Sequence, residues 1–107
     1  MNSEGMVLIT ARPPHPGELL REDYLPECGL TVASLAKRIG VSRQTVNELV
    51  HERRALTPDI ALRLAKVFGT TAQYWLNLQH NVDLWDSLEL NAQSIEEIEE
   101  LPIAAIG

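Results

Sequence analysis

The chain has 107 residues, a formal net charge of −6 and a hydrophobic content of 45%. This length supports one modest hydrophobic core, so we expect one folded domain and no second domain that would enclose an active site. The single cysteine, Cys28, excludes an internal disulfide. We see neither a secretory leader nor an apolar run of about 18 residues, which favours a cytoplasmic protein with no membrane segment.

The N-terminal part is predicted to be an arm followed by a first helix. Residues 1–14 form the expected arm, and the apolar piece at residues 6–9 is typical of a short strand or a disordered segment. The first helix is predicted over residues 16–24, because a Pro-Gly pair opens it and Leu19 and Leu20 supply an apolar inner face.

Residues 30–49 have the pattern of two short helices joined by a tight turn. Thr31 offers a hydroxyl that caps the first of them, and Gly40 ends it, because glycine adopts the left-handed backbone without a steric cost. Ser42 caps the second helix, which has an apolar stripe at Val46, Leu49 and Val50. The pattern predicts a DNA-binding helix-turn-helix, with an ordinary helical hairpin as the alternative.

The polar face of the second helix carries side chains that are suited to reading DNA bases. Arg43, Gln44 and Asn47 lie off the apolar stripe, towards the N-terminal end that meets base edges in helix-turn-helix proteins. Arginine pairs with guanine through two hydrogen bonds, and glutamine and asparagine pair with adenine in the same way. Glu48 departs from this pattern, and we expect it to face water.

Other residues around this helix are suited to the phosphate backbone. Arg53 and Arg54 follow the helix where a phosphate strand would pass, and the helix start at Thr31 offers a hydroxyl and backbone N–H groups. Such contacts position a protein on DNA without reading its sequence. The predicted DNA-binding residues are therefore Thr31, Ser42, Arg43, Gln44, Thr45, Asn47, Arg53 and Arg54.

Two more helices complete a predicted all-α, five-helix domain. The Thr-Pro-Asp sequence at residues 57–59 is typical of a helix start, and an apolar pattern follows it up to Gly69. Thr70 or Thr71 caps the last helix, in which residues 75–88 are too apolar for a helix that faces only solvent. We expect part of that surface to lie in the core and part in an interface.

The net charge is unevenly distributed along the chain. Residues 31–66 contain seven lysines and arginines and three acidic residues, a balance of +4, which leaves −10 for the rest of the chain. A basic middle has the sign that DNA requires, whereas acidic ends either engage a basic partner or serve only solubility. We expect residues 15–92 to form the helix-turn-helix domain and residues 93–107 an acidic, partly apolar C-terminal tail.

The sequence gives no indication of an enzyme. His15, His51 and His80 lie in no metal-binding spacing, and Cys28 has no cysteine partner. A glycine-rich phosphate loop is also missing. We therefore expect no catalytic residue, no metal and no cofactor, and we interpret the three histidines as structural.

Three blocks resemble a known family. They are HPGELLREDYL at residues 15–25, ERRALTPDIALRLAKVFG at residues 52–69 and WLNLQ at residues 75–79. In this order they are similar to the HigA and VapI antitoxins, within the XRE, or lambda-repressor-like, helix-turn-helix group. The resemblance implies a homodimeric antitoxin that represses its own operon on double-stranded operator DNA and neutralises a small basic mRNA-cleaving toxin of the HigB type.

Two positions depart from the pattern of that family. Glu52 stands where a glycine is usual, which leaves open the turn geometry and the aim of Arg53 and Arg54. Val82 stands where a tyrosine is common.

The surface for a toxin is predicted to be the N-terminal arm together with the first helix. The arm has strand-forming residues and no evident partner strand in an otherwise helical chain, and its candidate contacts are Val7, Leu8, Ile9 and Arg12. A homodimer arm would have the same sequence. The alternative to an antitoxin is a stand-alone phage-type or metabolic repressor that binds DNA without a toxin partner.

Overall fold

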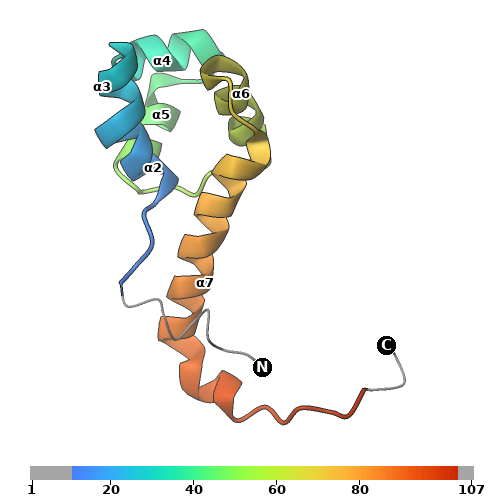
Figure 1. Cartoon of the computed structure of the whole chain (residues 1–107). Helices are drawn as coiled ribbons and strands as arrows, with labels where there is room; N and C mark the ends of the chain where they lie inside the picture. The colour runs from blue at the N-terminus through green and yellow to red at the C-terminus, as the bar shows by residue number, and fades with distance from the viewer. Residues whose placement is uncertain (1–10, 104–107) are drawn as a thin grey trace.

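The structure, a computed structural model, describes residues 11–103 and is helical throughout its regular elements (Figure 1). The apolar piece at residues 6–9, predicted as a short strand or a disordered segment, lies outside the described residues together with its candidate contacts Val7, Leu8 and Ile9. The elements are α2 (Pro16–Leu19), η1 (Leu20–Tyr24), α3 (Leu25–Cys28), α4 (Val32–Ile39), α5 (Arg43–Val50), α6 (Pro58–Phe68) and α7 (Ala72–Glu96). The first three follow one another without a break, so the predicted five-helix all-α fold is confirmed.

The first helix extends beyond its predicted end at Tyr24 and continues through α3 to Cys28. Its middle, η1, is a π-helix, and the backbone N–H of Leu25 donates to the carbonyl of Leu20, five residues earlier. Pro26, which has no N–H, comes directly after this wide turn. A proline normally ends or kinks a regular α-helix, and a π turn is one way for a helix to absorb such an irregularity.

The predicted helix starts of the helix-turn-helix are confirmed. The Thr31 hydroxyl accepts from the backbone N–H of Ser34 at 3.0 Å, and the Ser34 hydroxyl accepts from that of Thr31 at 2.8 Å, which makes a capping box at the start of α4. Gly40 ends α4 with φ +75°. At the start of α5 the Ser42 hydroxyl accepts from the backbone N–H of Thr45 at 3.0 Å.

The next two helices also begin at predicted residues. The Thr57 hydroxyl accepts from the backbone N–H of Ile60 at 3.3 Å and caps α6. Of the two candidates for α7, Thr71 is the cap, with its hydroxyl 3.0 Å from the backbone nitrogen of Tyr74. Thr70 has a different role, because its hydroxyl accepts from the indole N–H of Trp75 at 2.7 Å.

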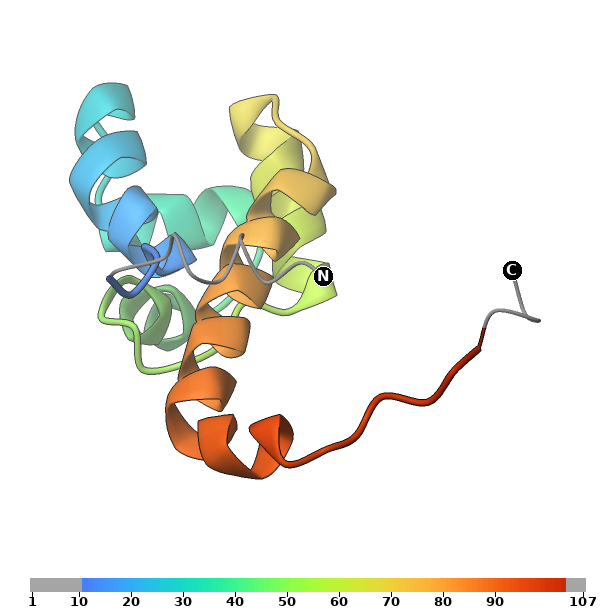
Figure 2. The same ribbon diagram turned by 60° about the horizontal axis from the view of Figure 1, so that its bottom comes forward.

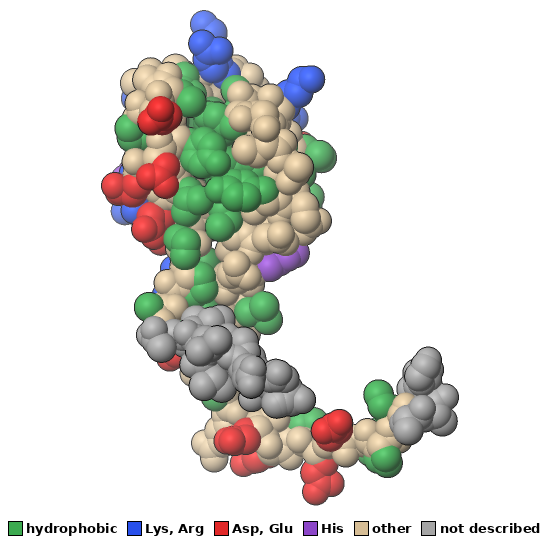
Figure 3. Space-filling view, viewed as in Figure 1, with side chains coloured by type: hydrophobic (Ala, Val, Ile, Leu, Met, Phe, Trp, Pro, Cys, Tyr) green, Lys and Arg blue, Asp and Glu red, His purple; other side chains and the backbone are tan. Residues whose placement is uncertain are grey.

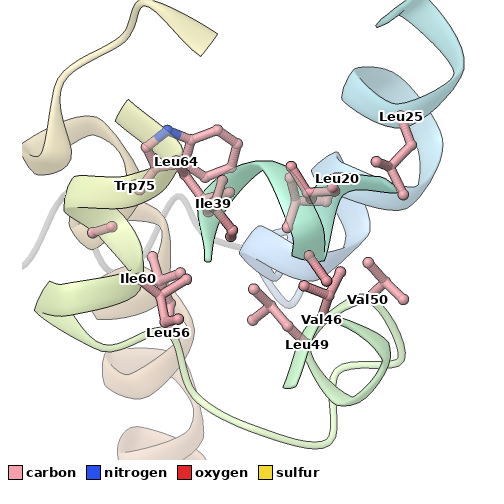
Figure 4. Close-up of a cluster of buried hydrophobic side chains, with 13 residues drawn as sticks. Leu20, Leu25, Ile39, Val46, Leu49, Val50, Leu56, Ile60, Leu64 and Trp75 are labelled. Atoms are coloured by element: carbon pink, nitrogen blue, oxygen red, sulfur yellow. The ribbon is translucent and has the colours of Figure 1, made fainter. Parts of the chain in front are cut away.

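The core lies where the first helix, α4, α5 and α6 meet the beginning of α7 (Figure 4). Its fully buried side chains include Leu20, Leu35, Leu49, Leu64 and Trp75. The Trp75 ring packs beside those of Tyr24 and Phe68, with centroids 4.9 and 6.2 Å away. The apolar stripes predicted for α5 and α6 face this core, which fixes the outward side of α5.

Helix α7 has two parts with different surroundings. Trp75 and Val82 are buried in the domain, whereas Leu84 and Leu90 are 63% and 83% exposed. The second part extends away from the other helices, and the chain continues beyond its end without regular structure (Figures 1 and 2). The predicted burial of part of this helix in the core is therefore confirmed, and the predicted interface on its exposed part stays a prediction. Within the described residues, no helix is both long and apolar enough to span a membrane.

His15 caps the first helix while buried, with only 4% of its surface exposed. Its Nδ1 accepts from the backbone N–H of Gly17 at 2.9 Å, so the ring must be unprotonated at that nitrogen. Burial is the main cause that lowers the pKa of His15 below its ordinary value of 6.5, although the carboxylate of Glu52 acts in the opposite direction.

The melting temperature is therefore expected to fall as the pH is lowered from about 7 to 5. Since the folded pKa of His15 is lowered, the unfolded chain binds the proton more readily, and the stabilisation is complete above pH 6.5 and is lost below it. Thermal unfolding at several pH values measures this. His15→Asn is the control, because asparagine keeps a capping oxygen but does not titrate. An equal fall in the variant would assign the pH dependence to other groups.

Candidate nucleic-acid interface

Helix α5 presents the predicted base-reading residues to solvent. Arg43, Gln44 and Asn47 are exposed, whereas Val46 and Leu49 on the opposite side are buried. The three polar residues lie within the first five positions of the helix, next to its capped start. The structure thus brings them together on one exposed face at the end of α5 that a DNA groove would admit.

Ser42 and Thr45 have a clear local role at the same helix end. Their hydroxyl oxygens are 2.7 Å apart, and the Ser42 oxygen also accepts from the Thr45 backbone N–H. These contacts fix the first turn of α5 and so the direction of the side chains that follow. Thr31, at the start of α4, is exposed and engaged in its capping box with Ser34.

The expectation that Glu48 simply faces water is wrong. Its Oε2 accepts from the side-chain amide of Gln44 at 3.0 Å, and its Oε1 accepts from Nε of Arg54 at 3.1 Å. The hydrogen bond from Gln44 and then that from Arg54 lower the pKa of Glu48. Glu48 thus links a predicted base-reading side chain to a predicted phosphate-binding one. Gln44 lies one helical turn before it, a spacing at which side chains meet.

The turn after α5 has a left-handed residue at Glu52, with φ +60°. Glycine adopts this conformation without a steric cost, whereas a residue with a Cβ is disfavoured there. Here the Glu52 carboxylate lies 3.3 Å from Nη1 of Arg21 and 3.8 Å from Nη1 of Arg12. Arg21 also donates to the carbonyl of Val50 at the end of α5. Ion pairs therefore hold the turn that directs Arg53 and Arg54.

The cations of the basic middle segment differ in how they are engaged. Arg54 is paired with Glu48, and Arg63 is paired with Asp59 while its Nη1 donates to the carbonyl of Ile39 at 2.7 Å. Arg63 is therefore occupied at the end of α4. Within residues 11–103, five cations of this segment have no ion pair: Lys37, Arg38, Arg43, Arg53 and Lys66.

Two contacts of buried residues were not predicted, one at the end of α5 and one in the loop between α5 and α6. Gly17 packs so closely against the end of α5 that a Cβ on it would lie 1.8 Å from the carbonyl oxygen of Leu49. Gln79, which is 5% exposed, accepts from the backbone N–H of Leu56 at 2.8 Å and donates to Asp83 at 2.9 Å. Both residues lie in the blocks HPGELLREDYL and WLNLQ, but neither pattern reveals a contact with a distant backbone atom.

No group of three or more metal-ligating side chains occurs among residues 11–103. His15 caps the first helix, and the Nδ1 of His51 lies 2.8 Å from the carbonyl oxygen of Asn47. His80 is exposed on α7. The candidate interface consists of α5, which we call the reading helix, its caps and nearby cations.

Comparisons with known proteins show to which family the chain belongs. A helix-turn-helix family model matches residues 20–75. Virulence-associated protein I of Dichelobacter nodosus is 51% identical over 81 residues, which cover 76% of this chain and 74% of that protein. Antitoxin HigA-1 of Vibrio cholerae is 43% identical, with 71% of each chain covered.

A solved structure of an antitoxin is similar to this chain in both sequence and fold. The antitoxin HigA of Pseudomonas aeruginosa, solved with the higBA promoter, is 43% identical and has a TM-score of 0.80, and the match covers 85% of this chain and all of that one. The chain therefore belongs to the family of helix-turn-helix regulators that includes the HigA antitoxins and virulence-associated protein I.

Proposed function

We propose that this chain is the antitoxin of a HigB/HigA-type toxin–antitoxin module. It binds operator DNA, represses its own operon, and neutralises a small basic mRNA-cleaving toxin. The observation that carries the DNA-binding half is the exposed end of α5, where Arg43, Gln44 and Asn47 follow a capped helix start. The likeness to an antitoxin HigA solved with its promoter supports both halves. Such a regulator acts in the cytoplasm and needs no catalytic residue.

On DNA, the residues divide into two groups. Arg43, Gln44 and Asn47 read base edges in the major groove. The others serve phosphate contacts or hold the reading helix in place: Thr31, Ser42, Thr45, Arg53 and Arg54. Glu48 holds one N–H of Gln44 and the Nε of Arg54, so these two side chains meet DNA with their remaining groups or by leaving the carboxylate. Glu48 does not hold the side chains of Arg43 and Asn47.

The chain acts as a homodimer in this proposal. One short reading helix makes few base contacts, and two copies place a second helix in the next major groove, about 34–36 Å away. The exposed apolar side chains of the second part of α7, such as Leu84 and Leu90, support this, because a second copy would cover them. Measuring the mass of the purified chain in solution tests it.

In the proposed neutralisation, the N-terminal arm contacts the toxin. Its candidate contact residues are Val7, Leu8, Ile9 and Arg12. The Arg12 guanidinium makes two hydrogen bonds to the Asp86 carboxylate, at 2.9 and 3.0 Å. A toxin carboxylate would therefore have to displace Asp86. Deleting residues 1–11 is expected to abolish toxin binding and to leave operator binding intact, as measured by pull-down and by DNA titration. Toxin binding by the shortened chain would place the contact elsewhere.

Co-expression with the neighbouring genes tests the whole proposal. The chain is purified after expression together with its immediate chromosomal neighbours, and the intact masses of co-purifying proteins are measured. A stoichiometric small basic protein encoded next to this chain is the expected result, and toxin neutralisation is then assayed by growth. Recovery of the chain alone, with the neighbours expressed and in solution, would indicate the stand-alone repressor instead.

A further inference from the structure

A hollow of about 620 Å³ lies between the first helix and the junction of α6 and α7. Its floor includes the rings of Tyr24, Phe68 and Tyr74, and the acidic side chains on its rim are Glu22, Asp23 and Glu27. Figure 3 shows this side of the domain, with hydrophobic side chains gathered in the middle and acidic ones along the edge formed by the first helix. The feature is thus an apolar surface with a one-sided acidic border.

The charge of the rim is only partly compensated. Glu22 pairs with Arg21 at 2.9 Å, but no ion pair within residues 11–103 holds Asp23 or Glu27. Among the residues that the structure describes, no lysine or arginine lines the hollow. The hollow therefore attracts a positive charge and repels a negative one.

The aromatic floor is held in place from below. The Tyr24 ring packs 4.8 Å from that of Phe68 and 4.9 Å from that of buried Trp75, and its hydroxyl donates to the Tyr74 hydroxyl at 3.3 Å. Burial and this hydrogen bond raise the pKa of Tyr24 to about 12, so the ring stays uncharged at neutral pH. Fixed, neutral aromatic rings beside carboxylates suit the alkyl stem and the charged end of a lysine or arginine side chain.

We propose that this hollow is a docking site for a lysine- or arginine-bearing segment of the basic partner protein. The inference rests on the proposed toxin-binding function and adds a second surface to the arm. None of the predicted DNA-binding residues lines the hollow. The partner therefore occupies it while α5 stays available, and one chain holds DNA and the partner at the same time.

The test uses the full chain and the basic protein encoded next to it. The double variant Asp23→Asn/Glu27→Gln removes two negative charges from the rim. Glu96→Gln/Glu97→Gln removes the same charge from the exposed end of α7 and is the matched control. We expect the rim variant to bind the partner about tenfold more weakly, with a smaller dependence on salt, and the control to bind like the original chain. Operator binding and the melting temperature should be unchanged in both.

Cys28 supplies a second readout, because it is the only cysteine of the chain and lies exposed at the hollow. Alkylation of Cys28, followed by intact mass, is expected to slow when the partner is bound but not when operator DNA alone is bound. This measurement needs no substitution. It therefore detects occupation of the hollow even if the rim variant were to fold poorly.

The possible failures are distinguishable. If the original chain captures no basic partner, the proposed function and the docking site are both overturned. If the rim variant captures the partner as well as the control does, and Cys28 is not protected, the function stands and the docking site is overturned. If the rim substitutions instead change the mass of the free chain in solution, the hollow is a contact between copies of this chain, which also overturns the proposal.

Discussion

Gly17→Ala is expected to destabilise the protein strongly and to weaken operator binding. A Cβ at this position would lie 1.8 Å from the carbonyl oxygen of Leu49 and 2.8 Å from its carbonyl carbon. Both atoms belong to the backbone of α5, so relief requires the first helix and the reading helix to move apart. Overpacking of this kind costs about 3 kcal/mol, a large part of a typical domain stability of roughly 5–15 kcal/mol. Urea unfolding measures the loss.

Gly69→Ala is the matched control for this prediction. Gly69 has φ +70°, and a Cβ there would meet no atom within 4 Å, so alanine adds backbone strain without a steric clash. That strain is worth about 1–2 kcal/mol. The variant should remain folded and bind DNA, because Gly69 lies between α6 and α7, away from α5. If Gly17→Ala is no less stable than Gly69→Ala, the close approach of the first helix to α5 does not restrict residue 17 to glycine.

Arg43→Ala is expected to remove most of the preference for the operator. Arg43 is the first residue of α5 and is exposed, and no ion pair within residues 11–103 engages its guanidinium. A bidentate contact to guanine contributes about 1–3 kcal/mol of discrimination, which corresponds to a loss of about 5- to 150-fold on the operator. Titrations on operator and random DNA, at one salt concentration, measure the difference.

Arg54→Ala provides the contrast. As a phosphate contact, Arg54 should affect operator and random DNA alike, and its loss should reduce the slope of log affinity against log salt by about one. Because Arg54 is paired with Glu48, its loss should lower the affinity for DNA by less than the loss of an arginine without an ion pair. An equal loss on both DNAs for Arg43→Ala would assign Arg43 to phosphate as well. An unchanged slope for Arg54→Ala would remove Arg54 from the backbone contacts.

The parts of the fold that follow from local chemistry could be predicted from the sequence. Thr31, Ser42 and Thr57 cap helices through hydrogen bonds to residues three positions later, and this requirement is visible in a short stretch of sequence. The buried side of α5 follows from its apolar spacing in the same way. These local features suffice to place Arg43 and Asn47 on the exposed side.

The errors come from contacts between distant segments or from irregular backbone. Pro26 looks like the end of the first helix, and only the π turn before it shows how the helix continues. Gln79 resembles any polar residue of an amphipathic helix, although it accepts from the backbone of Leu56, 23 residues away. The environment of Glu48 depends on the path of the chain after α5, which brings Arg54 back beside it. The spacing of residues along a helix does not predict how the chain runs after the helix ends.

The salt bridges around Glu52 change what a salt titration of this protein would measure. In a relative with glycine at this position, the turn after the reading helix needs no charge to adopt its left-handed conformation. Here the same turn is tied to Arg21 and Arg12 by partly exposed ion pairs, which salt screens in part. Raising the salt concentration therefore loosens the protein's own presentation of Arg53 and Arg54 as well as their contacts with phosphate. The number of phosphates deduced from the slope is then an upper bound.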